Sequence, residues 1–306
     1  MTLLALYEVA APAKLNLFLH VVGRRADGYH LLQSLFVLID WCDTLHFELR
    51  RDFALARHDL SATLPADDLC LRAARALQTA SGTALGADIS IDKQVPWGAG
   101  MGGGSSDAAS TLLALNRLWG LNWPRSRLLS LGLTLGADVP FFLGGHNAIV
   151  EGIGERLTPV TMPRQWLAVL KPAASIETRA IFASPLLVRS SEAAILESLS
   201  PNAQIERPSA FQAVCAPLEP GFGRNDLQPP AEAESPQVAR AAAVLHKAFG
   251  NSRMTGSGSA VFARAGSAAR AVEQPNAAMP AEVASEWVGK MCRSLVEHPL
   301  VGWAED

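Results

Sequence analysis

The stretch PWGAGMGGGSS, residues 96–106, carries the strongest structural signal in the sequence. Five glycines fall within residues 98–104, after an alternating segment at 87–93 that predicts a strand. The apolar segment that follows at 107–119, DAASTLLALNRLW, predicts a helix. Glycine allows positive φ and lets a bulky anion approach backbone amides, and a helix N-terminus adds unpaired N–H groups and a positive dipole end. The pattern therefore predicts a phosphate-binding loop.

Two other phosphate-binding loops match this stretch less well. The P-loop pattern needs a lysine directly after the glycines, and none is present. The dinucleotide-binding pattern fits only in part, because the loop begins near residue 98 and no acidic residue ends a second parallel strand about 20 residues later. A flexible loop with a serine helix cap is the remaining alternative, and the strand–loop–helix context favours phosphate over it.

Outward from this loop, strands and helices follow one another without a strict order. Residues 13–21 alternate, with Leu15 and Leu17 on one face and Lys14 and Asn16 on the other, which predicts a strand. The segment 23–30 predicts a hairpin turn. Further strands are expected at 31–39, 44–49, 147–151 and 166–171, helices at 68–79, 126–135, 178–183, 191–199, 238–249 and 281–297, a loop at 229–237, and a turn leading into a strand at 253–263. This mixture favours an α+β fold.

The composition limits the classes of protein that fit. A length of 306 residues suggests about two domains. With 49% hydrophobic residues, 18% charged residues and a net charge of −3, the chain is neither disordered nor a sequence-independent nucleic-acid binder. Its four cysteines lie far apart and do not have the spacing of a zinc site. It also has no apolar run of about 18 residues, the length that a membrane-spanning helix needs. We therefore expect a reduced, cytoplasmic protein with no nucleic-acid or membrane partner.

Several motifs resemble one known family. PWGAGMGGGSSDAA resembles the glycine-rich second motif of the GHMP kinase superfamily, APAKLNLFLHV at 11–21 its N-terminal strand motif, and MTGSGSAVFA at 254–263 its third motif. The order and spacing match over nearly the whole chain. ADGYHLLQSLF at 26–36, GADVPFFLGG at 136–145, KPAASIETRAIF at 171–182 and RND at 224–226 resemble the branch that acts on a cytidyl-linked sugar alcohol.

The resemblance implies a fold and an activity. The activity is transfer of the ATP γ-phosphoryl group to the 2-hydroxyl of 4-diphosphocytidyl-linked methylerythritol, in the non-mevalonate isoprenoid pathway. The fold is the two-domain GHMP kinase fold. Its N-terminal ATP-binding domain, 1–160, is similar to ribosomal protein S5 domain 2, and its C-terminal substrate domain is 161–306. The active site lies in the cleft between them, and the last helix packs back on the first domain.

The resemblance also implies roles for individual residues, each with a simpler alternative. It makes Lys14 and Asp138 catalytic, although a solvated lysine and an ordinary turn aspartate would look the same. It places the cytidyl substrate at Asn16, Tyr29, His30, Thr178 and Phe182, where Phe182 could instead be core, His30 a surface side chain and Thr178 a helix cap. It assigns ATP to Pro96, Trp97, Gly98, Ala99, Gly100, Met101, Gly102, Gly103, Gly104, Ser105 and Ser106.

Some points stay open at this stage. Mg²⁺ is expected with ATP, but the sequence does not identify its ligands, and Asp107 places a negative charge beside the phosphate loop. A monomer and a homodimer are both compatible with the sequence. Another small-molecule GHMP kinase, for homoserine or mevalonate, would not need the DGYH segment and Phe182. A non-catalytic nucleotide sensor would not need both Lys14 and Asp138.

Overall fold

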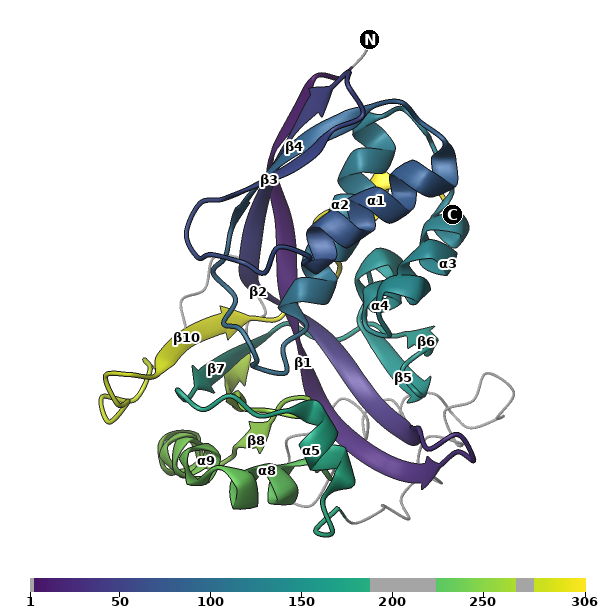
Figure 1. Ribbon diagram of the computed structural model, residues 1–306. Coiled ribbons are helices and arrows are strands. Elements are labelled where there is room, and N and C mark those ends of the chain that lie inside the picture. The colour runs from purple at the N-terminus through teal and green to yellow at the C-terminus, as the bar shows by residue number, and fades with distance from the viewer. Residues whose placement is uncertain (1–2, 188–223, 268–277) are drawn as a thin grey trace.

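The computed structural model describes residues 3–187, 224–267 and 278–306 and contains two β-sheets (Figure 1). The first sheet has six strands in the order β3-β4-β2-β5-β6, with β1 paired antiparallel to β2. Its strands are β1 (Ala5–Arg24), β2 (His30–Arg50), β3 (Leu55–Asp59), β4 (Gly86–Asp92), β5 (Ala148–Gly152) and β6 (Arg156–Pro159). The long β1–β2 pair runs through most of the molecule and connects its two ends (Figure 1).

Helices cover the first sheet and enclose its core. They are α1 (Leu69–Ser81), α2 (Gly103–Leu118), α3 (Arg125–Leu135) and α4 (Val139–Gly144). The predicted helix at 68–79 is confirmed as α1, whose N-cap Asp68 accepts a hydrogen bond from the Leu71 amide at 3.1 Å. Helix α2 begins at Gly103, inside the glycine run and four residues earlier than the apolar pattern indicated. The last residues of the glycine loop therefore form the first turn of α2.

The second sheet has four strands in the order β10-β7-β9-β8. These are β7 (Gln165–Lys171), β8 (Arg253–Met254), β9 (Val261–Ser267) and β10 (Val288–Arg293), with helices α5 (Thr178–Ala183), α8 (Gln228–Glu234) and α9 (Pro236–Phe249) beside them. Leu15 and Val37 of the first sheet share one buried cluster with Val169 and Phe262 of the second. The two sheets thus pack on each other through the β1–β2 pair. The predicted α+β fold is confirmed, and the division at residue 160 stays a prediction.

The expected final helix at 281–297 is wrong. Residues 288–293 form β10, which pairs antiparallel with β7 and buries Cys292. A strand edge left open would expose unpaired N–H and C=O groups, so pairing at this edge overrides the local helical pattern. The part of the chain that returns to the first sheet's helices is the irregular tail after β10, which ends in the 3-10 turn η1 (Val301–Trp303). It is held by Arg125, whose amide donates to the Glu305 carbonyl at 2.6 Å.

The loop expected at 229–237 is also wrong, because α8 and α9 occupy it almost entirely. Prolines stand in the first turn of both helices, where the absent N–H would have had no helical partner. The prolines in this segment therefore mark the starts of two helices and do not interrupt a helix. The helix expected at 191–199 lies outside the described residues. Within the described ranges, no helix has the length and apolar character needed to cross a membrane.

Candidate active site

The glycine loop is shaped by left-handed backbone that only glycine adopts without strain. Gly100 and Gly102 have φ of 71° and 70°. A Cβ on Gly100 would lie 2.4 Å from the Thr255 carbonyl oxygen, and one on Gly102 would lie 3.0 Å from Cζ of Phe142 and 3.2 Å from Cγ of Lys14. The loop is thus wedged between the Lys14 strand, helix α4 and the turn after β8.

Backbone hydrogen bonds fix the loop from two sides. The Met101 carbonyl accepts from the Lys14 amide of β1 at 2.9 Å. On the other side, the carbonyls of Gly98 and Ala99 accept from the amides of Ser259 and Ala260, both at 3.2 Å. These three carbonyls therefore point into the protein. The first amides of α2 have no helical acceptor, so they are available as donors to an anion.

Lys14 is buried on β1 and points toward Asp138. Its Nζ donates to Oδ1 of Asn16 at 2.5 Å and lies 3.7 Å from Oδ2 of Asp138. The ammonium also lies 4.1 Å from the centre of the Phe36 ring. Burial lowers the pKa of Lys14, and the charge of Asp138 partly opposes this. Asp138 is the residue before α4 and remains about one-third exposed, at 32%, so it can reach a substrate.

A network that the sequence did not predict holds Asn16 in place. The Thr255 hydroxyl accepts from the Asn16 amide at 2.9 Å and donates to its side-chain Oδ1 at 3.2 Å. The Asn16 side-chain amide donates to Oγ of Ser34 at 3.0 Å. With both sides fixed, Oδ1 of Asn16 stays directed at Lys14. The only sequence signal for this contact was that Thr255 belongs to the motif MTGSGS.

The charge of Asp107 is neutralised beneath the loop. Lys93, at the end of β4, lies 2.6 Å from Oδ2 of Asp107 and also pairs with Asp43. Burial raises the pKa of Asp107 well above its ordinary range, and the Lys93 charge opposes this. Asp43 in turn accepts hydrogen bonds from the amides of Gln94 and Val95 at 2.6 and 2.7 Å. The network anchors the chain that leads into the loop.

The two loop serines have different surroundings. Ser106 is buried and its hydroxyl donates to the Pro12 carbonyl at 2.7 Å, which ties α2 to β1. It does not cap the helix, whose N-cap is Gly102 with no side-chain hydrogen bond. Ser105 lines the cavity beside the loop, and its Oγ lies 4.0 Å from the Cβ position of Gly136, two residues before Asp138. Only Ser105 is therefore placed to meet a ligand.

The aromatic residues expected at the cytidyl group lie together at the far end of β1 and β2. The His30 ring stacks on Phe182 of α5, with centroids 5.0 Å apart and an interplanar angle of 25°. Tyr29, at the hairpin, is 61% exposed. The Thr178 hydroxyl lies 2.7 Å from Oγ of Ser257, while the N-cap of α5 is Glu177. Thr178 thus connects α5 to the turn after β8 and is not the helix cap.

A cavity of about 380 Å³ lies beside the glycine loop. Its walls are the loop itself and the segment before and at the start of α1; they include Pro65, Asp68, Leu69, Lys93 and Trp97. A larger cavity of about 710 Å³ lies between the end of α2 and the C-terminal tail. No residue with a predicted role lines it, so the cavity at the loop is the candidate site. Within the described ranges, no three His, Cys, Asp or Glu side chains form a metal-binding group.

Comparison with known proteins agrees with this geometry. Residues 68–146 match the model of the GHMP kinases N terminal domain and residues 215–281 that of the GHMP kinases C terminal domain. A protein of Methylibium petroleiphilum named 4-diphosphocytidyl-2-C-methyl-D-erythritol kinase is 64% identical over 99% of this chain and 100% of its own. One of the same name from Albidiferax ferrireducens is 54% identical over 98% of this chain and 96% of its own.

Solved structures give the same result. A crystal structure of 4-(cytidine 5'-diphospho)-2C-methyl-D-erythritol kinase has a TM-score of 0.66 at 34% identity, covering 84% of this chain and 90% of that one. Homoserine kinase from Cytophaga hutchinsonii, also with a TM-score of 0.66, covers 97% of this chain and 96% of its own, and at 15% identity it shows the fold alone. This chain belongs to the GHMP kinases and, within them, to the 4-diphosphocytidyl-2-C-methyl-D-erythritol kinase family.

Proposed function

We propose that this protein is an ATP-dependent kinase that phosphorylates the 2-hydroxyl of 4-diphosphocytidyl-2-C-methyl-D-erythritol, a step of the non-mevalonate isoprenoid pathway. The observation that carries the proposal is that the side chains of Lys14 and Asp138 lie 3.7 Å apart, beside the glycine loop. Nucleotide binding alone would need the loop but not this pair. The identity with named relatives supports the substrate.

ATP would place its phosphates on the amides at the start of α2. Lys14, in contact with the loop and held by Asn16, supplies a fixed positive charge there. Phosphoryl transfer depends mainly on positioning and on neutralising the charge that develops on the transferred group. A buried cation does this well, because no water reorganises around it during transfer.

Asp138 would act on the acceptor hydroxyl. The 2-hydroxyl oxygen attacks the γ-phosphorus, the bond from that phosphorus to the bridging oxygen of ADP breaks, and the hydroxyl proton passes to the Asp138 carboxylate. Its partial exposure leaves room for the sugar alcohol, and the Lys14 ammonium lies 3.7 Å from its Oδ2.

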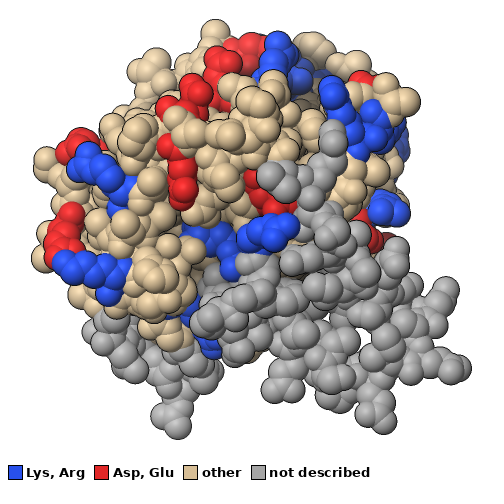
Figure 2. Space-filling view, turned by 90° about the horizontal axis from the view of Figure 1, so that it is seen from below, with Lys and Arg blue, Asp and Glu red and all other residues tan. Residues whose placement is uncertain are grey.

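The cytidyl group would bind at the other end of the β1–β2 pair. Tyr29, His30 and Phe182 offer aromatic faces, and base–aromatic stacking contributes about 1–3 kcal/mol per base. His30 and Phe182 stack on each other here, so the base would stack against this pair or separate its two rings. The face seen from below carries Lys and Arg side chains near its middle, which suits a substrate with a diphosphate (Figure 2).

Mg²⁺ fits the donors at the loop. It keeps several waters and typically takes one or two carboxylates together with substrate phosphates. The Ser105 hydroxyl and the Asp138 carboxylate come from neighbouring parts of the site and are the protein oxygens that we propose to face it. When bound, the ion would neutralise phosphate charge. The cytoplasmic location and the choice between monomer and homodimer stay predictions.

A coupled ADP-release assay tests the function. Purified protein is given ATP and, in turn, the cytidyl-linked methylerythritol, homoserine, mevalonate and galactose. We expect ADP release with the cytidyl substrate alone, and phosphorus NMR of the product should show a phosphomonoester on the 2-hydroxyl. Turnover of homoserine or mevalonate instead would overturn the substrate, and nucleotide binding without turnover of any acceptor would favour a sensor.

A further inference from the structure

An irregular segment forms the wall of the nucleotide cavity opposite the glycine loop. It joins β3 to α1 over residues 60–68, and Pro65, Asp67 and Asp68 from it line the cavity together with Leu69. This wall belongs to no helix or strand. Its shape must therefore be held by side-chain contacts, because loops without such contacts stay mobile.

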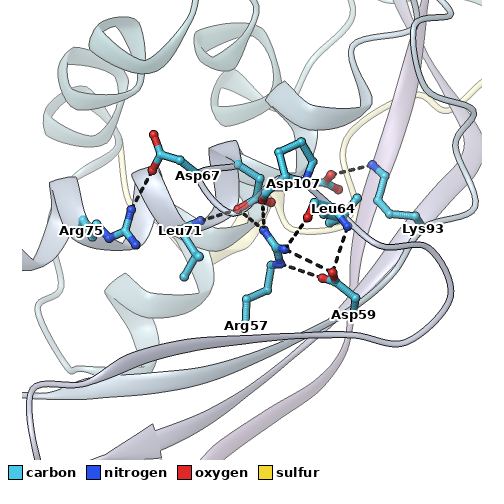
Figure 3. A network of polar contacts seen from close by, with 10 residues as sticks. Arg57, Asp59, Leu64, Asp67, Leu71, Arg75, Lys93 and Asp107 are labelled. Atoms are coloured by element: carbon cyan, nitrogen blue, oxygen red, sulfur yellow. Dashed lines mark hydrogen bonds and ion pairs between the residues drawn. The ribbon is translucent and has the colours of Figure 1, made fainter.

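Arg57 provides the largest set of these contacts, beside the contacts of Ser61 with the Lys93 backbone and of Arg75 with Asp67. Arg57 of β3, whose side chain is 8% exposed, donates through Nε and Nη2 to the two carboxylate oxygens of Asp59, at 2.7 and 3.2 Å. Its Nη1 and Nη2 donate to the backbone carbonyls of Pro65 and Leu64 at 2.8 and 3.1 Å. Nη1 also lies 2.9 Å from Oδ1 of Asp68. Five donor contacts can occupy every N–H of a guanidinium (Figure 3).

These contacts reach both ends of the wall. Asp59 also accepts from the Leu64 amide at 2.9 Å, so Arg57 and Asp59 together close a tight loop. Asp68 accepts from the Leu71 amide as the N-cap of α1, so the same arginine connects the wall to the helix start. Arg57 therefore fixes the second half of the wall, residues 64–68, at the start of α1, whereas Ser61 holds the first half through the Lys93 backbone.

The charge of Arg57 matters as much as its shape. Asp59 and Asp68 are both paired with it, and the Asp68 side chain is only 9% exposed and faces the cavity. Without the guanidinium, the Asp68 carboxylate would stand uncompensated in the wall of a site that must accept a polyanionic nucleotide. Like charges at such separations disfavour binding, and more strongly where water is partly excluded.

From these contacts we infer that Arg57 is a positioning residue for the nucleotide: it holds the cavity wall at 64–68 and compensates the Asp68 carboxylate, and it thereby sets the affinity for ATP. This inference rests on the proposed function. Arg57 touches neither the loop nor the pair of Lys14 and Asp138, so we expect nucleotide affinity to depend on it while turnover at saturation does not.

The test compares R57M, which keeps an apolar stem, with R75M. Arg75 pairs with Asp67 at 2.7 Å in the same region, but both side chains are more than half exposed, so this pair should contribute little. For R57M we expect the KM for ATP and the calorimetric Kd for ADP to rise about tenfold, as for loss of one charge-assisted interaction. The KM for the cytidyl substrate and kcat at saturating ATP should stay within about twofold, and R75M should match the wild type throughout.

If R57M does not fold, R57K keeps the positive charge but cannot make the paired contacts of the guanidinium, so the wall loosens without a change of charge and the ADP Kd should rise about threefold. A folded variant with a normal ADP Kd, or with both KM values raised equally, overturns the inference and leaves Arg57 a purely structural role. A wild-type chain that neither binds ADP nor releases it from ATP would instead overturn the proposed function.

Discussion

The ammonium of Lys14 lies 3.7 Å from Oδ2 of Asp138, although one residue belongs to β1 and the other to the turn before α4. The sequence separates them by more than a hundred residues, and the packing of α4 against the glycine loop brings them together. A cation and a carboxylate at this distance suit a reaction in which a phosphate is held and a hydroxyl loses its proton.

The first prediction concerns Asp138. Asp138→Asn keeps the shape but removes the charge and basicity, so kcat should fall by about 10²–10⁴. The KM for the cytidyl substrate should stay within a few-fold, because toward this substrate the group acts mainly in the transition state. Steady-state kinetics with circular dichroism as folding control measures this. A folded variant with near-normal kcat would remove Asp138 from the chemistry.

The second prediction concerns the glycine loop. Gly102→Ala adds a Cβ 3.0 Å from Phe142 at a φ of 70°, so the start of α2 must shift and the KM for ATP should rise. Gly250→Ala is the matched control, since Gly250 has a φ of 71° and its Cβ would meet nothing within 4 Å. We expect the control to keep the wild-type KM. Equal effects of the two substitutions would argue against a phosphate site at the loop.

The third prediction concerns base recognition. Phe182→Ala and Tyr29→Ala should each weaken binding of the cytidyl substrate, by about 1–3 kcal/mol where stacking is lost. The ATP KM should change little. Phe53→Ala serves as control, because the Phe53 side chain is about as exposed as that of Tyr29, 57% against 61%, and it follows β2 outside the proposed cytidine site. Normal substrate binding by both variants would leave the kinase activity in place but move the cytidine site elsewhere.

The fourth prediction concerns His298 in the C-terminal tail. Burial, together with the Arg125 charge, lowers the pKa of His298 from 6.5 to about 3. The unfolded chain therefore takes up a proton at higher pH than the folded one, so stability is lost as pH falls from about 6.5 toward 3. The slope from this group approaches 1.4 kcal/mol per pH unit.

Urea unfolding at pH 7.5 and pH 5.5 measures this loss, with His298→Gln as the non-titrating comparison. The wild type should lose about 1 kcal/mol more free energy of unfolding between the two pH values than the variant does. The other titrating groups are common to both proteins and cancel. An identical loss in the two proteins would show that His298 is protonated in the folded state as easily as in the unfolded one.

Local patterns predicted much of the fold and part of the site. The alternation of residues 13–21 gave β1, the Asp68 cap and apolar spacing gave α1, and five glycines before an apolar run gave the loop that leads into α2, whose phosphate role stays a prediction. Each of these depends on residues close together in the chain. The resemblance then added Lys14, Asp138 and the aromatic residues, whose roles no local pattern could supply.

The errors arose where a distant partner outweighed local propensity. Residues 288–293 have a helical pattern but form β10, because β7 offers a strand edge that must be paired. The prolines of 229–237 begin helices because α8 and α9 pack their buried faces on the second sheet's core. Propensity is a weak preference per residue, and burial of one apolar face exceeds it.

By itself, the sequence determined the long β1 strand, helix α1, the glycine loop before α2 and the family, since each depends on residue types at short spacing or on motifs in fixed order. Only the tertiary structure decided that Thr255 orients Asn16 toward Lys14, that Lys93 neutralises Asp107, and that Arg57 holds the cavity wall. The reason is physical: a buried polar or charged group needs a partner, and the partner is whichever group the packing of the two sheets and their helices brings within hydrogen-bond distance.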